Sequence, residues 1–282
     1  MANTYEQKDT ILHVENLSIA YNNKVIIGDI NFQEKDTVRQ GKSQGQIIAF
    51  VGRSGRGKST LFRALTGLEK PTTGRVLIPD YSKAVADGKQ PAKIVAEGDV
   101  GFVNQRYTLF RHKTVHSALL FALRNSKMSS AEKEEKISSY INDWGLDKCR
   151  NQYPNQLSGG QRQRTAILEQ LLSSGYYMVL DEPFSGLDIG NIMSVKKAFQ
   201  LINESHELNT IIFSTHDIEL AVELADSLYV LGYKEGQNPE QNSYGTLLKH
   251  FDLKEMGLAW QNEFTPKHLE LTKEIKDLML KS

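Results

Sequence analysis

The sequence contains a single cysteine, Cys149, among its 282 residues. One thiol excludes an intramolecular disulfide. No histidine stands near Cys149 in the sequence to activate it as a nucleophile. We therefore interpret Cys149 as a structural thiol in a protein of a reducing compartment.

An excess of charge of either sign is also missing, since 34 basic side chains balance 34 acidic ones and give a net charge of +0. This balance argues against a large nucleic-acid footprint. Long apolar runs are absent as well: "IIAFV" (47–51), "ALLFAL" (118–123) and "YYMVL" (176–180) are far shorter than a membrane span. The polar stretch "MANTYEQKDT" lacks the apolar core of a secretory signal. We expect a protein that reaches a membrane only through a partner.

The order of apolar runs and turn residues predicts an α/β fold. Strands and helices alternate from residue 176 to residue 232, which favours a mostly parallel sheet with helices on its faces. The runs 10–21 and 24–33 are typical of an antiparallel strand pair. Other expected elements are a polar loop over 34–46, a strand over 47–51, an irregular excursion over 79–98 with room for a short helix, a strand over 100–105, a mainly helical stretch over 113–149, a helix capped by Ser158, and a helix over 265–280 with Leu271, Ile275 and Leu278 on one face.

The stretch "GRSGRGKS" (52–59) matches the Walker A pattern between a strand and a helix. Its glycines permit a tight loop whose N–H groups wrap phosphates. Lys58 reaches the outer phosphates in such a loop, and the Ser59 hydroxyl can hold Mg²⁺.

Two acids end the apolar strand in "YYMVLDEP" (176–183). Adjacent acids at a strand end are usually a solvated turn. Beside a phosphate loop, however, Asp181 would reach the Mg²⁺ shell and Glu182 could deprotonate an attacking water. His216 and Gln105 also follow strands, where ligand sites of parallel sheets collect, although each could be an ordinary surface residue.

The stretch "LSGGQRQR" (157–164) is a second phosphate-friendly segment about a hundred residues after the first. Its serine and glycines would stand at a helix N-terminus, which attracts anions. The chain's own phosphates already have a loop, so the purpose of this second segment is not evident from the residues alone.

The set of motifs resembles the nucleotide-binding domain of ABC transporters, over about residues 10–232. Walker A at 52–59, Gln105, "LSGGQ" at 157–161, "YYMVLD" with Glu182, "SGLD" at 185–188 and His216 occur in the family's order. The resemblance implies a P-loop NTPase core, an N-terminal antiparallel β subdomain and an α-helical subdomain inserted at about 106–170. It places the ATPase domain at 1–240 and a C-terminal helical extension at 241–282.

The resemblance also implies roles for individual residues. Glu182 is the expected catalytic base, His216 the contact to the γ-phosphate, Gln105 a sensor that reaches Mg²⁺, and Asp188 a link between two active sites. Tyr21 matches the aromatic that stacks on adenine, although a strand-end aromatic needs no such role. The expected ATP-binding residues are Tyr21, Gly52, Arg53, Ser54, Gly55, Arg56, Gly57, Lys58, Ser59 and Thr60, with Lys58 also catalytic; Ser59, Gln105 and Asp181 would hold Mg²⁺; and Ser158, Gly159, Gly160 and Gln161 would bind the ATP of a second subunit.

The resemblance implies partners and a place in the cell. A second ATPase subunit, integral membrane permease subunits and, for an importer, a solute-binding protein would assemble with this chain on the cytoplasmic face of the membrane, without nucleic acid. The segment "RYTLFRHKTV" (106–115) stands where permease coupling helices dock, or is a solvated basic loop. The longer loop 34–46, the stretch 79–98, and Glu169 and Gln170 in place of Ala-Arg-Ala depart from the family pattern.

Three other functions stay open at this point. One is an ATPase of translation or DNA repair, which the single Walker A motif, the absence of sustained heptads and the neutral charge disfavour. Another is a non-hydrolysing module, which intact Lys58, Asp181, Glu182 and His216 oppose. The third is a subunit of an exporter or lipid-handling system. An ATPase chain without membrane helices favours the ATP-hydrolysing motor subunit of a bacterial-type importer, although exporters with separate subunits also exist.

Overall fold

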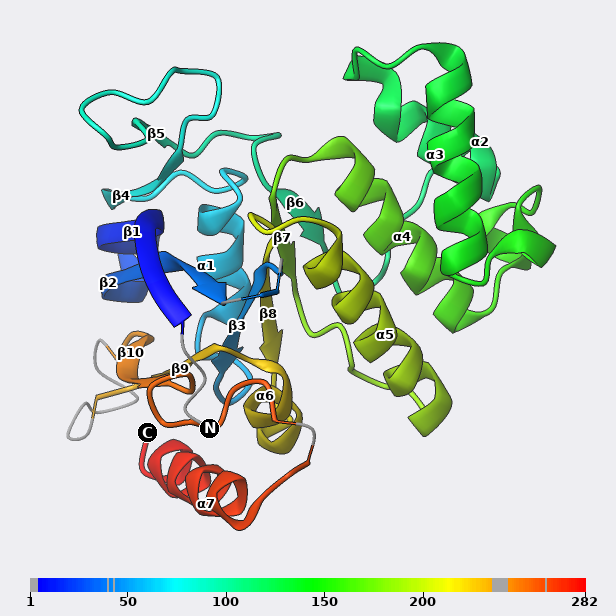
Figure 1. Cartoon of the computed structure of the whole chain (residues 1–282). Helices are drawn as coiled ribbons and strands as arrows, with labels where there is room; N and C mark the ends of the chain where they lie inside the picture. The colour runs from blue at the N-terminus through cyan, green and yellow to red at the C-terminus, as the bar shows by residue number, and fades with distance from the viewer. Residues whose placement is uncertain (1–4, 40, 43, 235–242, 262) are drawn as a thin grey trace.

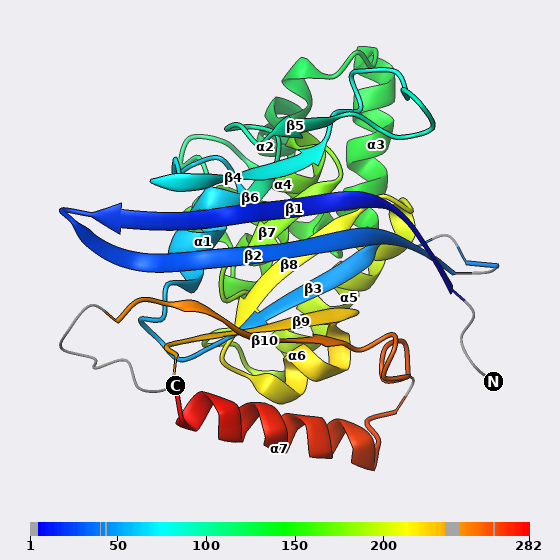
Figure 2. The ribbon, with the colours of Figure 1, turned by 90° about the vertical axis from the view of Figure 1, so that its left-hand side faces the viewer.

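The computed structural model describes residues 5–39, 41–42, 44–234, 243–261 and 263–282. Its strands form two sheets (Figures 1 and 2). The first is antiparallel and follows the order β2–β1–β4–β5, built from β1 (Tyr5–Tyr21), β2 (Lys24–Arg39), β4 (Thr73–Pro79) and β5 (Ala92–Ile94). The second follows the order β10–β9–β3–β8–β7–β6, built from β3 (Gln46–Val51), β6 (Gly101–Val103), β7 (Tyr177–Leu180), β8 (Thr210–Thr215), β9 (Ser227–Gly232) and β10 (Thr246–Asp252).

The second sheet is parallel except at β10, which runs antiparallel to β9. Its central strands β3 and β8 are buried along their whole length, as expected for strands covered on both faces. The predicted antiparallel pair and the parallel-rich sheet are both confirmed.

Helices fill the connections between the strands. They are α1 (Lys58–Leu65), α2 (Val115–Ala122), α3 (Ser130–Asp143), α4 (Gly159–Ser173), α5 (Ile189–Ser205), α6 (Ile218–Leu224) and α7 (Pro266–Leu280). Figure 1 shows α2 and α3 lying away from both sheets, while α1 lies between them. Leu61, Phe62 and Leu65 of α1 are buried in a core shared by the two sheets. Within the described ranges, no helix combines the length and apolarity that crossing a bilayer requires.

The loop predicted over 34–46 is wrong for its first half, because β2 continues to Arg39 and pairs with β1 as far as Tyr5. Glu34 explains the error, because a charged residue after an apolar run predicts a loop, whereas only 4% of the surface of Glu34 is exposed. Ser227 and Tyr229 of β9 each donate a hydrogen bond of 2.6 Å to its Oε1. Because the donors to the Glu34 carboxylate lie in the other sheet, nothing in the sequence around Glu34 indicates that it is buried.

The C-terminal segment contains a strand that the sequence analysis did not predict. β10 adds to the edge of the second sheet beside β9, and α7 follows it against α6 (Figure 2). Leu271 and Ile275 of α7 are buried as expected, and Leu278 is half-buried. The predicted domain boundary at residue 240 lies outside the described residues. In the 79–98 stretch, the described residues form β5 and turns rather than a short helix.

Cys149 is buried, and its thiol donates to the Leu146 carbonyl at 3.2 Å, which agrees with a structural role. Gln170 and Glu169, the two departures from the family pattern, have separate explanations. Gln170 Oε1 accepts a hydrogen bond of 3.2 Å from Phe102 N and so ties α4 to β6. Glu169 is buried in α4, and this burial raises the pKa of its carboxyl to about 7 even though Lys113 and Arg124 oppose the shift.

Glu169 should therefore make the stability of the fold depend on pH. The pKa of the Glu169 carboxyl is raised in the folded state. The stability that the protonated carboxyl contributes is therefore fully present below the unfolded-state pKa of about 4.5 and is lost as the pH rises through the folded-state pKa of about 7. The free energy of unfolding of the wild type relative to Glu169→Gln should fall on the order of 2–3 kcal/mol between pH 4.5 and 7.5. Urea unfolding of both proteins at several pH values measures this, and a difference that does not change with pH would contradict it.

Candidate functional site

The phosphate loop joins β3 to α1 and requires glycine at its end. Gly57 has a φ of 91°, and a Cβ atom there would lie 2.2 Å from Ile27 Cγ2 of β2. Any larger residue would both strain the backbone and push the loop off β2. The close contact between the phosphate loop and Ile27 of the antiparallel sheet is therefore possible only with glycine at position 57.

Lys58, the first residue of α1, turns its side chain back into the loop. Its Nζ donates to the Gly52 carbonyl at 2.6 Å and lies 3.3 Å from Glu182 Oε1. The residue is 7% exposed, so the ammonium is held in a nearly buried position beside a carboxylate. These contacts hold the amine at the mouth of the loop, where a phosphate would replace them.

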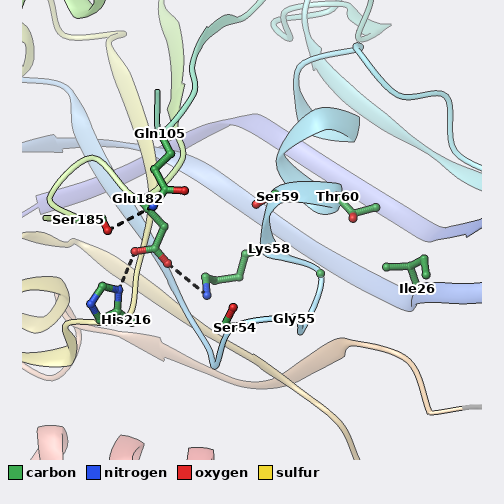
Figure 3. A pocket seen from close by; sticks show the side chains of 11 residues that line it. Ile26, Ser54, Gly55, Lys58, Ser59, Thr60, Gln105, Glu182, Ser185 and His216 are labelled. Atoms are coloured by element: carbon green, nitrogen blue, oxygen red, sulfur yellow. Dashed lines mark hydrogen bonds and ion pairs between the residues drawn. The ribbon is translucent and has the colours of Figure 1, made fainter. Parts of the chain in front are cut away.

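Glu182 stands between two partners that are distant in sequence. Besides the contact to Lys58, its Oε2 lies 2.9 Å from His216 Nδ1 (Figure 3). Its φ is 51°, a left-handed conformation that non-glycine residues rarely adopt. Strained backbone of this kind persists where the surrounding structure holds it, and is common at functional sites.

Ser214 of β8 is the residue that holds both acids. Its hydroxyl donates to Asp181 Oδ1 at 2.7 Å and accepts from Glu182 N at 2.9 Å. Asp181 N in turn donates to the Val103 carbonyl at 2.9 Å. The two acids at the end of β7 are thus fixed by both neighbouring strands.

A cavity of about 400 Å³ opens above these groups. It brings together residues from the phosphate loop and from the ends of three strands, as parallel sheets do at their carboxyl edge (Figure 3). Of the predicted site residues, Ser54, Gly55, Gly57, Lys58, Ser59, Thr60, Gln105, Glu182 and His216 line it. Tyr21, Gly52, Arg53, Arg56 and Asp181 are outside the lining.

Two of these outlying residues have clear surroundings. Tyr21 ends β1 with 43% of its surface exposed. Arg56 turns away from the cavity: its guanidinium lies 3.9 Å from the centre of the Tyr233 ring and donates to the Ser282 carbonyl at 2.9 Å. The Arg56 side chain therefore contacts the C-terminal segment, and only its backbone belongs to the loop.

The side chains predicted to hold Mg²⁺ fit that ion chemically. Ser59 and Gln105 line the cavity, and Asp181 lies directly beside Glu182 with one oxygen engaged by Ser214. Mg²⁺ prefers oxygen ligands and is usually bound by one or two carboxylates together with substrate phosphates. One carboxylate, one hydroxyl and one amide oxygen match that pattern.

The segment 158–161 and Asp188 lie elsewhere. None of the described residues 158–161 lines the cavity. Ser158 caps α4: its hydroxyl accepts from Gln161 N at 3.3 Å, and Ser158 N donates to Gln161 Oε1 at 2.9 Å. Asp188 caps α5 by accepting from Asn191 N at 2.8 Å. Both caps leave a helix N-terminus at the surface, away from the phosphate loop of the same chain.

Three contributors to the site were missed in the sequence. Ser185 accepts a hydrogen bond from Gln105 Nε2 at 3.3 Å, Ile26 lines the cavity from β2, and Ser214 holds the acids. Ser185 begins the "SGLD" motif, and Ser214 is a hydroxyl at the end of the run "TIIFS", so both left a signal. Ile26 reaches the site because the antiparallel sheet packs beside the phosphate loop, and no pattern in the sequence around Ile26 predicts that packing.

Known proteins resemble this chain along most of its length. A sulfate/thiosulfate import ATP-binding protein from Synechocystis sp. is 34% identical over 218 residues, covering 77% of this chain and 57% of its own length. A probable sulfate/thiosulfate import ATP-binding protein from Chlorella vulgaris is 35% identical over 202 residues, which cover 71% of this chain and 82% of the length of that protein. The chain thus spans little more than half of the first relative.

Among solved structures, cbiO1 from Clostridium perfringens, part of the ABC transporter complex cbiONQ, superposes with a TM-score of 0.67. It is 24% identical and covers 97% of this chain and 98% of its own, which shows a shared fold. The family model described as "ABC transporter" matches residues 36–185, more than half of the chain. On these matches and the motif order within them, the chain belongs to the ABC transporter family.

Proposed function

We propose that this chain is the ATP-hydrolysing motor subunit of a transporter whose membrane-spanning subunits are separate chains. The observation that carries the proposal is the cavity that joins the phosphate loop to Glu182, His216 and Gln105. Loop N–H groups and Lys58 would bind the phosphates, and Tyr21 would stack on the adenine. Mg²⁺, held by Ser59, Gln105 and Asp181, would neutralise phosphate charge.

Glu182 is proposed as the general base. Its carboxylate faces the cavity, with His216 holding Oε2 on one side and Lys58 lying against Oε1 on the other. When phosphates draw the Lys58 ammonium away, Oε1 becomes available to accept a proton from water. His216 keeps the other oxygen in place and reaches into the same cavity, where it would contact the γ-phosphate.

Two copies are proposed to close head-to-tail on two ATP molecules. Ser158 and Gly159 are exposed at the N-terminus of α4, and Gly160 is buried directly behind them. Ser158 and the N–H groups of Gly159 and Gly160 would bind the γ-phosphate held by the partner's phosphate loop, with Gln161 completing the cap. Asp188 would link the two sites across the interface. ATP that binds the closed dimer more tightly than the open one supplies the work of transport.

Uptake is the proposed direction, since the relatives are described as sulfate/thiosulfate import proteins. Permease subunits and a solute-binding protein are the proposed partners, on the cytoplasmic face of the membrane. An inorganic oxyanion is the first cargo to test. This subunit would not touch the cargo itself.

Removal of Mg²⁺ tests the proposed chemistry. The purified protein should release phosphate from ATP in the presence of Mg²⁺, should lose nearly all of that activity in excess EDTA, and should recover it when Mg²⁺ is restored. Phosphate release is measured directly. Activity that persists unchanged in EDTA would rule out the proposed role of Ser59, Gln105 and Asp181.

A further inference from the structure

A hollow of about 290 Å³ lies where α3 ends, against the second turn of α4 and the middle of α5. We call it the α3–α5 hollow. The side chains that matter for its chemistry are those of Asp143, Trp144, Arg164, Lys197, Ala198 and Leu201. The α3–α5 hollow shares no lining residue with the ATP cavity, so an occupant would not compete with ATP for space.

Arg164 brings a positive charge into the hollow without a partner for it. The residue is half-buried, and its Nε is buried without a hydrogen-bond partner. No ion pair among the described residues includes Arg164. Burial lowers the pKa of its guanidinium, which shows that the surroundings do not compensate the charge. Because a half-buried charge without a counter-ion costs free energy, an anion from outside the chain would stabilise it.

The other charges of the hollow favour an anion with a single negative charge. Lys197 of α5 adds a second cation, which is exposed and belongs to no ion pair of the described residues. Asp143 is the one acid among the residues that line the hollow, and its Oδ2 accepts a hydrogen bond of 3.1 Å from the Ser139 hydroxyl. A phosphate group carries close to two negative charges and would leave an excess beside Asp143. A carboxylate carries one, and it matches the guanidinium fork in a two-point contact.

The hollow also has an apolar wall. Trp144 and Ala198 are 4% and 2% exposed, and Leu201 is half-buried beside them. An inorganic ion would use the cations and leave this wall in contact with water. An apolar cavity of about 150 Å³ is enough for a benzene ring, so the hollow has room for a ring-sized body that carries a carboxylate.

One residue of the hollow approaches the 158–161 segment. A Cβ atom added to Gly160 would lie 3.6 Å from Arg164 Nη1, so the guanidinium lies behind that glycine. Residues four apart on a helix are neighbours on one face. A ligand of Arg164 would therefore lie one helical turn from the segment that is proposed to bind the partner's ATP.

We propose that the α3–α5 hollow binds a small organic monocarboxylate, whose carboxylate contacts Arg164 and Lys197 and whose apolar body packs against the Trp144 wall. This site goes beyond the proposed transport function and does not depend on it. It accounts for an arginine that is half-buried without any partner in the described parts of the chain.

Benzoate is the probe that tests this inference, and benzamide has the same shape without the charge. Both are titrated by ligand-detected NMR into the full chain saturated with Mg-ADP, so that the phosphate loop is already filled. The wild type should bind benzoate about tenfold or more tightly than benzamide, because the contact between carboxylate and guanidinium is charge-assisted.

Two variants and a matched control locate the binding. Arg164→Gln should weaken benzoate binding about tenfold while leaving benzamide binding unchanged, since only the charged contact is lost. Lys197→Gln, on the exposed surface of α5, should weaken benzoate binding by about threefold, as loss of a solvent-exposed charge contact does. Arg162→Gln is the control, because Arg162 is exposed on the same helix and does not line the hollow. It should bind benzoate as the wild type does.

Several results would overturn the inference. Equal binding of benzoate and benzamide would do so, as would no binding of benzoate, or equal weakening by Arg164→Gln and Arg162→Gln. If sulfate displaced benzoate at equal concentration, the hollow would be a site for inorganic oxyanions and not for organic carboxylates. None of these measurements requires ATP hydrolysis, so the proposed function stands or fails separately.

Discussion

Glu182→Gln should reduce ATP turnover about a hundredfold or more, the usual effect of removing a general base. The amide keeps the size of the side chain and can still lie between Lys58 and His216, but it cannot accept a proton from water at neutral pH. ATP binding should be retained. Because ATP would then be bound without being consumed, the closed dimer should accumulate and elute as a dimer in gel filtration with Mg-ATP.

A matched control for this variant is Glu135→Gln on the exposed surface of α3, which should behave as the wild type does. Turnover and nucleotide affinity are measured on both. A Glu182→Gln protein that turns over ATP at the wild-type rate would show that another group accepts the proton, and the assignment of the base would be wrong.

Ser158→Arg should reduce turnover by a similar factor while leaving ATP binding to the monomer intact. The new side chain would block the N-terminus of α4, where the proposed partner phosphate binds. It would not reach the ATP cavity of its own chain, since Ser158 does not line it. Turnover at dimer-forming concentrations and nucleotide affinity at low concentration separate these two effects.

The fold offers a close control for the loss of the helix cap. Ser129 caps α3 with the same geometry, accepting from Glu132 N at 3.3 Å while Ser129 N donates to Glu132 Oε2 at 2.6 Å. Ser129→Arg should cost about 1 kcal/mol of stability, as a lost cap does, without lowering turnover. If both variants lost turnover equally, the effect of Ser158→Arg would be explained by loss of the helix cap and not by loss of phosphate binding.

The core of the site could be predicted from the sequence because its signals are local. The glycines of 52–57, Lys58 and the two acids after "YYMVL" stand beside buried strands, and the structure brings Lys58, Glu182, Gln105 and His216 around one cavity. Parallel strands end at a common edge, so residues that follow such strands are expected to meet.

The rest depends on contacts between distant segments. Glu34 is a strand residue because Ser227 and Tyr229 satisfy its carboxylate, and β10 joins the sheet because β9 offers an edge. A surface hollow likewise combines the chain after β6 with the 153–156 turn. No pattern within either segment reports such a pairing, since the partners lie tens to hundreds of residues away.

Each ATP site is proposed to be built from two chains, with Lys58 from one and Ser158 from the other. Mixing two inactive variants, Lys58→Ala and Ser158→Arg, tests it most directly. In a mixed dimer, the phosphate loop of the Ser158→Arg chain faces the intact 158–161 segment of the Lys58→Ala chain, so one complete site is restored.

Random pairing makes about half of the dimers mixed when the two variants are present in equal amounts. Turnover of the mixture should rise well above that of either variant alone and peak near equal proportions. Turnover that never exceeds the weighted mean of the two variants, at any ratio, would mean that each site lies within one chain and would contradict a site shared between two chains.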